Sequence, residues 1–169
     1  MLEGLLRGLR QPEYVHTLLN PLPIYGLGIA LIGLILALSF RSRPAQIIAL
    51  ILILLSALSV WPVVHYGEKA FDQVLTLADE DGRAWLEDHE DRAEKLMYFF
   101  YALAAVSGLA IILPRKWPRT AQPLAIATVA LAIASLGAGA SIAYAGGKIR
   151  HREFRTVPPP TKEEARNPR

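Results

Sequence analysis

Long apolar stretches separated by short polar segments dominate the pattern of this chain. Four of them cover about residues 23–40, 45–64, 96–113 and 123–145. Each is close to the ~20 residues that a helix needs to cross the hydrocarbon core of a bilayer. None contains Lys, Arg, Asp or Glu, whereas the helices of a soluble bundle keep a charged face. The pattern therefore predicts an all-α fold, an integral membrane four-helix bundle.

Amphipathic patterns flank these spans. Near the N-terminus Leu2, Leu5, Leu6 and Leu9 fall on one helical face, which predicts a short amphipathic helix lying at the membrane interface. One domain of spans and loops is expected over residues 1–155. The end of the chain, residues 156–169, is rich in proline and charge and is expected to be disordered.

The longest polar segment, residues 68–95, joins the second and third spans and holds ten acidic against four basic side chains. Apolar residues recur at i, i+3, i+4 and i+7 from Phe71 to Ala78, which predicts an amphipathic helix. The sequence Asp79-Glu80-Asp81-Gly82 is expected to end it, and a second helix is expected to start near Ala84 and continue into the third span. The bundle would thus carry a helical acidic loop at one end.

Small residues distinguish the fourth span. They recur at three- and four-residue spacing, at Ala127, Ala130, Ala134, Gly137 and Ser141. Small faces let membrane helices approach closely, so we expect this face to be buried in the bundle.

The composition excludes several kinds of chemistry. Cysteine is absent, so disulfides, thiolate metal sites, iron–sulfur ligation and covalent haem attachment are excluded. The chain has no nucleophile elbow, phosphate-binding loop or zinc-protease helix, so no catalytic residue and no enzyme activity is predicted. The net charge of +3 comes from basic residues at helix ends, which anchor membrane helices to headgroups; no nucleic-acid partner is predicted.

Basic residues also bear on orientation. The two short linkers between spans carry Arg41, Arg43, Arg115, Lys116 and Arg119, and the other thirteen of the eighteen Lys and Arg lie with the termini and the acidic loop. Counting all bases places both termini in the cytoplasm, whereas the density of bases in the short linkers argues the reverse. We expect a multi-pass protein of the inner (plasma) membrane with both termini on the cytoplasmic side.

The four histidines all fall at one end of the predicted bundle. His16 precedes the first span, His65 ends the second, His89 precedes the third and His151 follows the fourth. Facing helices can build a metal or haem site from such residues. His16 and His89 are the candidate metal or haem b ligands, and His65 could replace either. Alternatively, the histidines simply belong to an aromatic membrane interface.

Short motifs resemble those of a widespread bacterial family of predicted four-helix membrane proteins of unknown function. The segment from Val15 to Ile24 is similar to the family's opening motif, His-Pro-Leu-Leu-Val-His-Phe-Pro-Ile, and residues 137–147 are similar to its glycine-rich close. His89 lies where the family carries a histidine before its third helix. The family's second opening histidine corresponds to Pro21, so this chain lacks one candidate ligand. The resemblance implies a redox setting, because family members are sometimes joined to iron–sulfur or cytochrome modules.

Three functions are consistent with these features. The first is an accessory or scaffold subunit of a membrane complex, for instance a respiratory one, with the bilayer and other subunits or a second copy of the chain as partners. The second is a haem b or quinone-linked electron carrier using His16 with His65 or His89. The third, a small transporter, is disfavoured because no ionisable residue lies within a span.

Overall fold

The computed structural model describes residues 2–160, and this part of the chain is mostly helical and has no strand. The helices are α1 (Leu2–Gly8), α2 (Pro12–Leu19), the π-helical turn η1 (Leu22–Gly26), α3 (Leu27–Ser39), α4 (Arg43–Leu58), α5 (Val60–Leu77), α6 (Glu80–Ile112), η2 (Leu113–Arg115), η3 (Pro118–Thr120), α7 (Ala121–Arg150) and η4 (Arg152–Phe154). Of the predicted disordered tail, residues 156–160 form no helix and residues 161–169 lie outside the described residues.

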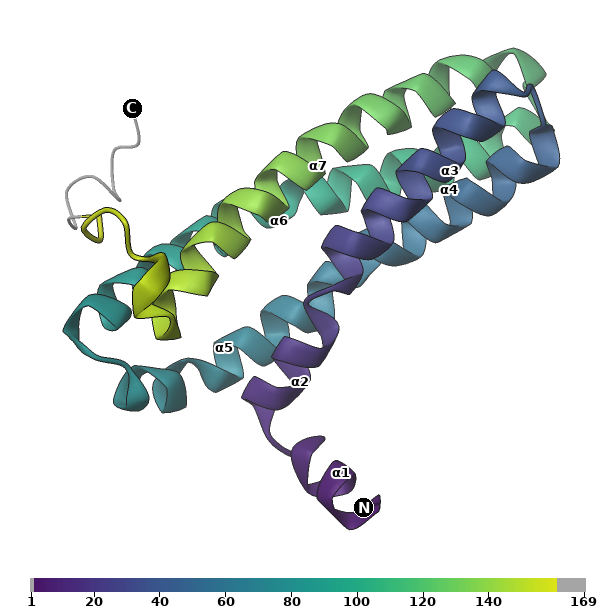
Figure 1. Cartoon of the computed structure of the whole chain (residues 1–169). Helices are drawn as coiled ribbons and strands as arrows, with labels where there is room; N and C mark the ends of the chain where they lie inside the picture. The colour runs from purple at the N-terminus through teal and green to yellow at the C-terminus, as the bar shows by residue number, and fades with distance from the viewer. Residues whose placement is uncertain (1, 161–169) are drawn as a thin grey trace.

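These elements form four long rods (Figure 1). They cover Pro12–Ser39, Arg43–Leu77, Glu80–Arg115 and Pro118–Arg150, and each is long and apolar enough to cross a membrane. The all-α four-helix bundle predicted from the sequence is therefore confirmed. Each rod also continues beyond its apolar span at the end that carries the histidines.

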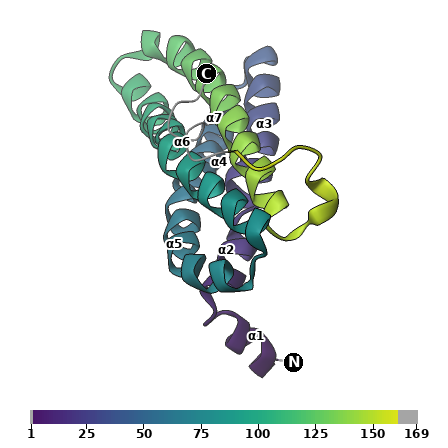
Figure 2. The same ribbon diagram turned by 90° about the vertical axis from the view of Figure 1, so that its left-hand side faces the viewer.

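The core of the bundle is closed where α3, α4, α6 and α7 run side by side (Figure 2). Several large side chains there have no exposed surface: Leu27, Leu34, Leu50, Ile53 and Leu103. Helix α6 packs mainly against α7 and α4, and α3 packs against α4. This closed half fixes the relative positions of the four rods.

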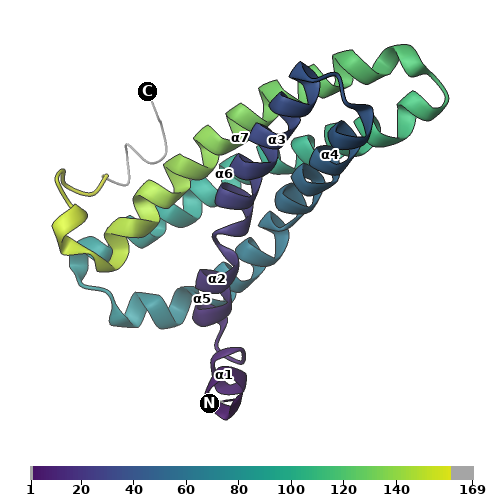
Figure 3. The ribbon, with the colours of Figure 1, turned by 45° about the vertical axis from the view of Figure 1, so that its right-hand side comes forward.

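The first rod changes its winding at a pair of prolines. Pro23 has no N–H to donate, and the N–H of Gly26 bonds to the carbonyl of Pro21 at 3.4 Å, five residues back. Such π-helical turns reposition the residues before them. Helix α2 leaves the closed half at this point and packs along α5 (Figure 3). The bundle is consequently wider at this end, the open end or open half, which is formed by α2, α5, the start of α6 and the end of α7.

The expected break between α5 and α6 is present. The Asp79 carboxylate accepts a hydrogen bond from the N–H of Gly82 at 2.9 Å and caps α6. The cap starts the helix at Glu80, so the predicted start near Ala84 was four residues too late.

The predicted burial of one small face of α7 is wrong. Ala127, Ala130, Ala134 and Gly137 are exposed and the fifth residue of this face, Ser141, is half-buried. A Cβ atom at Gly137 would meet nothing within 4 Å. The buried face instead includes Thr128 and Ser135, whose hydroxyls donate to helix carbonyls four residues back at 2.8 and 2.9 Å. A hydroxyl satisfied by its own helix can face a packed neighbour, so its position cannot be read from polarity.

Candidate functional site: two imidazoles in a cavity at the open end

A cavity of about 690 Å³ lies between α2, α5, α6 and α7 at the open end of the bundle. Its deep wall is apolar and includes Ile24, Val60 and Phe100, whereas its mouth carries several carboxylates. Cofactor pockets have volumes of roughly 300–1,000 Å³ and are mostly apolar with a few polar groups. Two of the polar groups in this cavity are the imidazoles of His16 and His89.

His16 projects from α2 onto α5. Its Nδ1 lies 2.8 Å from the carbonyl oxygen of Val63, and because a carbonyl can only accept, Nδ1 carries the hydrogen. The neighbouring residue on α5 is Gly67, where a Cβ atom would lie 3.0 Å from Nδ1. The Nδ1 edge of the ring therefore rests directly on the α5 backbone, and in the neutral ring Nε2 keeps its lone pair.

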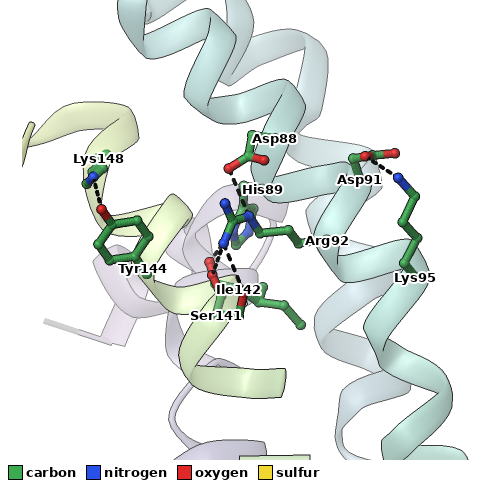
Figure 4. A network of polar contacts seen from close by, with 9 residues as sticks. All are labelled: Asp88, His89, Asp91, Arg92, Lys95, Ser141, Ile142, Tyr144 and Lys148. Atoms are coloured by element: carbon green, nitrogen blue, oxygen red, sulfur yellow. Dashed lines mark hydrogen bonds and ion pairs between the residues drawn. The ribbon is translucent and has the colours of Figure 1, made fainter. Parts of the chain in front are cut away.

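His89 makes the same kind of contact between α6 and α7 (Figure 4). Its Nδ1 lies 2.9 Å from the carbonyl oxygen of Ile142. A Cβ atom at Gly146 would lie 2.9 Å from its Cε1 and 3.0 Å from its Nδ1. His89 thus also presents a free Nε2 in its neutral form.

The two imidazoles are neighbours although 73 positions separate them in the chain. Their ring centres are 6.2 Å apart and the ring planes are nearly perpendicular, at 89°. Two imidazoles on opposite sides of one metal ion, each with a metal–nitrogen distance of about 2.0 Å, have ring centres about 6 Å apart. The observed separation fits that arrangement, and it is also the separation of two rings in direct edge-to-face contact.

Beside His89, a charged network joins α6 to α7 (Figure 4). Arg92 donates to the carboxylate of Asp88 at 2.9 Å and to the hydroxyl of Ser141 at 2.9 Å. Asp88 is buried, and a buried carboxylate needs a partner of opposite charge. Arg92 supplies this partner and at the same time holds the stretch of α7 that bonds to His89.

A second polar cluster lies one turn further out. The ammonium of Lys148 is almost completely buried, donates to the Tyr144 hydroxyl, and lies 4.1 Å from the ring centre of Trp85 and 3.8 Å from that of Tyr144. Cation–π contacts are strongest when the cation is desolvated. This cluster therefore fastens the end of α7 to the start of α6.

An ion pair closes the outer end of this region. Arg155, which follows η4, donates to both carboxylate oxygens of Asp79 at 2.9 and 2.8 Å and to the carbonyl of Ile149 at 2.9 Å. Together with the Gly82 N–H, the Arg155 guanidinium holds the pKa of Asp79 well below its usual range. The same pair raises the pKa of Arg155. The segment after α7 is thus tied to the loop before α6.

The mouth of the cavity is acidic, as the loop composition predicted. Its carboxylates come from α2, α5 and α6: Glu13, Glu68, Glu90 and Glu94. One is paired, because Arg150 on α7 donates to Glu13 on α2 at 3.3 Å. This ion pair crosses the cavity mouth.

The other two histidines take different positions. His65 does not line the cavity; its ring stacks on Trp61 with centres 5.6 Å apart and planes 4° apart. His151 borders the mouth but lies 2.9 Å from the carboxylate of Glu153 and stacks on Phe154. The structure therefore brings His16 and His89 together and does not bring His65 to them.

The groups that hold the two imidazoles were not predicted from the sequence. These are the carbonyls of Val63 and Ile142 and the bare backbone at Gly67 and Gly146. One signal was present: in both helices a glycine follows the carbonyl by four residues, within Val-Val-His-Tyr-Gly and Ile-Ala-Tyr-Ala-Gly.

No protein-family model, curated protein or solved structure matches the chain.

Proposed function

We propose that this chain is a multi-pass membrane protein that binds haem b between His16 and His89 and carries electrons. The observation that carries the proposal is the pair of imidazoles, each held through Nδ1 by a backbone carbonyl, with ring centres 6.2 Å apart in a largely apolar cavity. Nδ1–H donation to a carbonyl fixes the tautomer and orientation of histidines that bind metals through the other nitrogen.

The set of donors favours haem over a bare metal ion. Within residues 2–160 no group of three or more His, Cys, Asp or Glu side chains is arranged to hold a metal, and structural zinc needs four ligands. Haem would bring four nitrogen ligands of its own, so His16 and His89 would be the two residues by which the protein holds it. Haem would be held without covalent attachment, because the chain has no cysteine. When bound, haem supplies reversible one-electron chemistry at its iron.

The protein's own contribution would be positional. Val63 and Ile142 would orient the two imidazoles, and Ile24, Val60 and Phe100 would give the haem an apolar wall. Low water access and the hydrogen bonds of axial ligands are the features with which proteins tune haem potentials. An orientation with both termini in the cytoplasm, location in the plasma membrane and membership in the bacterial family described above remain predictions.

A second candidate function is an accessory subunit of a membrane complex. It is favoured by the exposed small residues of α7, among them Ala130, Ala134 and Gly137, because small exposed faces suit close contact with another membrane helix. The two functions are compatible, since an electron carrier can be one subunit of a complex.

Optical spectroscopy tests the proposal. Protein purified from haem-replete membranes should show a Soret band and, on reduction, an α band. His16→Ala and His89→Ala should each abolish the six-coordinate low-spin spectrum, whereas His65→Ala, the control, should retain it. A colourless wild-type protein, or a spectrum that survives both substitutions, would overturn the proposal and leave the accessory-subunit function.

A further inference from the structure

The contact between an imidazole and a helix backbone is built twice in this molecule, in the same way. In the first half, His16 near the start of one rod donates to the Val63 carbonyl in the second half of the next rod, and Gly67 follows four residues later. In the second half, His89 donates to Ile142, and Gly146 follows four residues later. Both contacts therefore share one pattern, a carbonyl at position i and a glycine at position i+4.

A side chain at either glycine would crowd the imidazole that lies on it. A Cβ atom at Gly67 would lie 3.0 Å from Nδ1 and 3.1 Å from Cε1 of His16. At Gly146 it would lie 2.9 Å from Cε1 and 3.0 Å from Nδ1 of His89. Ordinary van der Waals contacts between such atoms are longer than about 3.4 Å, so a methyl group at either position would push the ring away from the helix.

The spacing explains why the glycine lies at i+4. The carbonyl at i already accepts the N–H of residue i+4 in the helix, and the side chain at i+4 stands over that carbonyl on the same helix face. Without a side chain, the second lone pair of the carbonyl is open to the imidazole. Glycine is a poor helix former, and here a tertiary contact explains its presence in both helices.

We propose that Gly67 and Gly146 are ligand-positioning residues: each admits an imidazole to a helix carbonyl, holds it as the Nδ1–H tautomer, and so presents Nε2 to the cavity. The consequence for metal binding rests on the proposed haem function, whereas the tautomer follows from the protein alone. Because the two contacts are equivalent, alanine at either glycine should affect the histidine of its own half and leave the other in place.

The first test uses the protein without cofactor. Nitrogen-15 NMR of histidine-labelled protein, with signals assigned by His→Gln variants, reports which ring nitrogen carries the hydrogen. We expect the Nδ1–H tautomer for both His16 and His89 in the wild type. Finding the Nε2–H tautomer at either position in the wild type would overturn the proposal without the use of any glycine variant.

Alanine variants make the test specific. Gly67→Ala should remove the Nδ1–H tautomer of His16 and retain that of His89, and Gly146→Ala should do the opposite. The unaffected histidine reports that each variant is folded. Gly108→Ala and Gly137→Ala are matched controls, since a Cβ atom at either position meets nothing within 4 Å, and both should leave the two tautomers unchanged. A wild-type tautomer pattern in Gly67→Ala and Gly146→Ala would contradict the proposal.

Haem titrations of the same variants distinguish a failure of the glycine positioning role from a failure of the proposed haem function. In haem titrations, Gly67→Ala and Gly146→Ala should weaken binding by roughly 10–100-fold, the usual effect of losing a group that orients a metal-binding histidine, and the control variants should bind as the wild type does. If the wild type binds no haem but the tautomers respond as expected, the positioning role stands and the haem function fails. Wild-type haem affinity in both glycine variants would overturn the positioning role while leaving the haem function intact.

Discussion

The closed and open halves of the bundle are held together by different kinds of contact. In the closed half, apolar side chains such as Leu34, Leu50 and Leu103 are fully buried against one another. In the open half, single polar contacts connect the helices: imidazole to carbonyl, Arg92 to Asp88 and Ser141, and Arg155 to Asp79. Apolar packing is non-directional, whereas each hydrogen bond fixes one geometry.

This difference explains where the candidate site lies. The closed half provides a frame with a filled apolar core. The smaller pocket on this half, of about 380 Å³ between η1, α3 and α4, is lined by no ionisable side chain. The open half leaves about 690 Å³ unfilled and sets the position of each imidazole by a directional bond. A site that needs both space and defined ligand geometry is therefore found at the open end.

Filling the cavity should produce the largest effect. Gly139 is buried at the cavity wall, where a Cβ atom would already lie 3.3 Å from Ile24 and 3.4 Å from Phe100. Gly139→Leu should abolish haem binding in a haem titration and destabilise the protein by roughly 1–3 kcal/mol through overpacking.

Gly137→Leu is the matched control for this substitution. It adds the same side chain two residues away, where the surroundings are open, and should change neither haem binding nor stability. Equal haem binding in the two variants would contradict the assignment of the cavity as the site.

Replacing a leucine by alanine should reduce the free energy of unfolding more in the closed half than in the open half. Leu34→Ala, in the filled core, should destabilise the protein by about 2 kcal/mol through the cavity that it creates. Leu86→Ala removes the same atoms beside space that is already open, so fewer contacts are lost and about 1 kcal/mol is expected.

Denaturant titration in detergent measures both values. Leu36→Ala, at an exposed position of the same helix as Leu34, serves as the control and should change stability by less than about 0.5 kcal/mol. A larger loss for Leu86→Ala than for Leu34→Ala would show that the open half also depends on apolar packing.

The sequence predicted which helices form more accurately than it predicted which face of each helix is buried. The four rods follow from apolar length, and the break before α6 follows from Asp79 and Gly82. The buried face of α7 was mispredicted because the helix is apolar or small on all sides, so no polar stripe defines its orientation. The exposed row around Gly137 and the buried row around Ser135 are nearly equivalent in composition.

For the candidate site too, the sequence predicted where the elements lie but not how each helix is rotated. His16 and His89 were placed at one end of the bundle because rods joined in alternating directions bring both to the same side. Their contact depends on the rotation of α2 and α6 and on the space at Gly67 and Gly146, which only tertiary packing decides. His65 follows Val63 by two residues, which is about 200° further around α5, and its ring stacks on Trp61. The apolar pattern alone does not distinguish these two positions.

The smallest expected effect is a loss of stability of the open half at low pH. Asp79 is ionised and bound to Arg155 in the folded protein, with its pKa lowered below the usual value. A carboxyl with a lower pKa in the folded state stabilises it above the unfolded pKa of about 3.9, and this contribution is lost as the pH falls toward the folded pKa. Lowering the pH from 6 to 3 should therefore loosen the open half first.

Hydrogen–deuterium exchange, corrected for its intrinsic pH dependence, measures this loosening. In the wild type, amides at 80–90 should exchange faster at pH 3 than at pH 6, while those at 100–110, beside the apolar core, should change little. Asp79→Asn keeps a side chain that can cap α6 but removes the ion pair, so exchange at 80–90 should already be faster at pH 6 and should change less with pH. If both segments exchange faster by the same factor in the wild type, acid destabilises the bundle as a whole. The closed and open halves would then not differ in their stability toward acid.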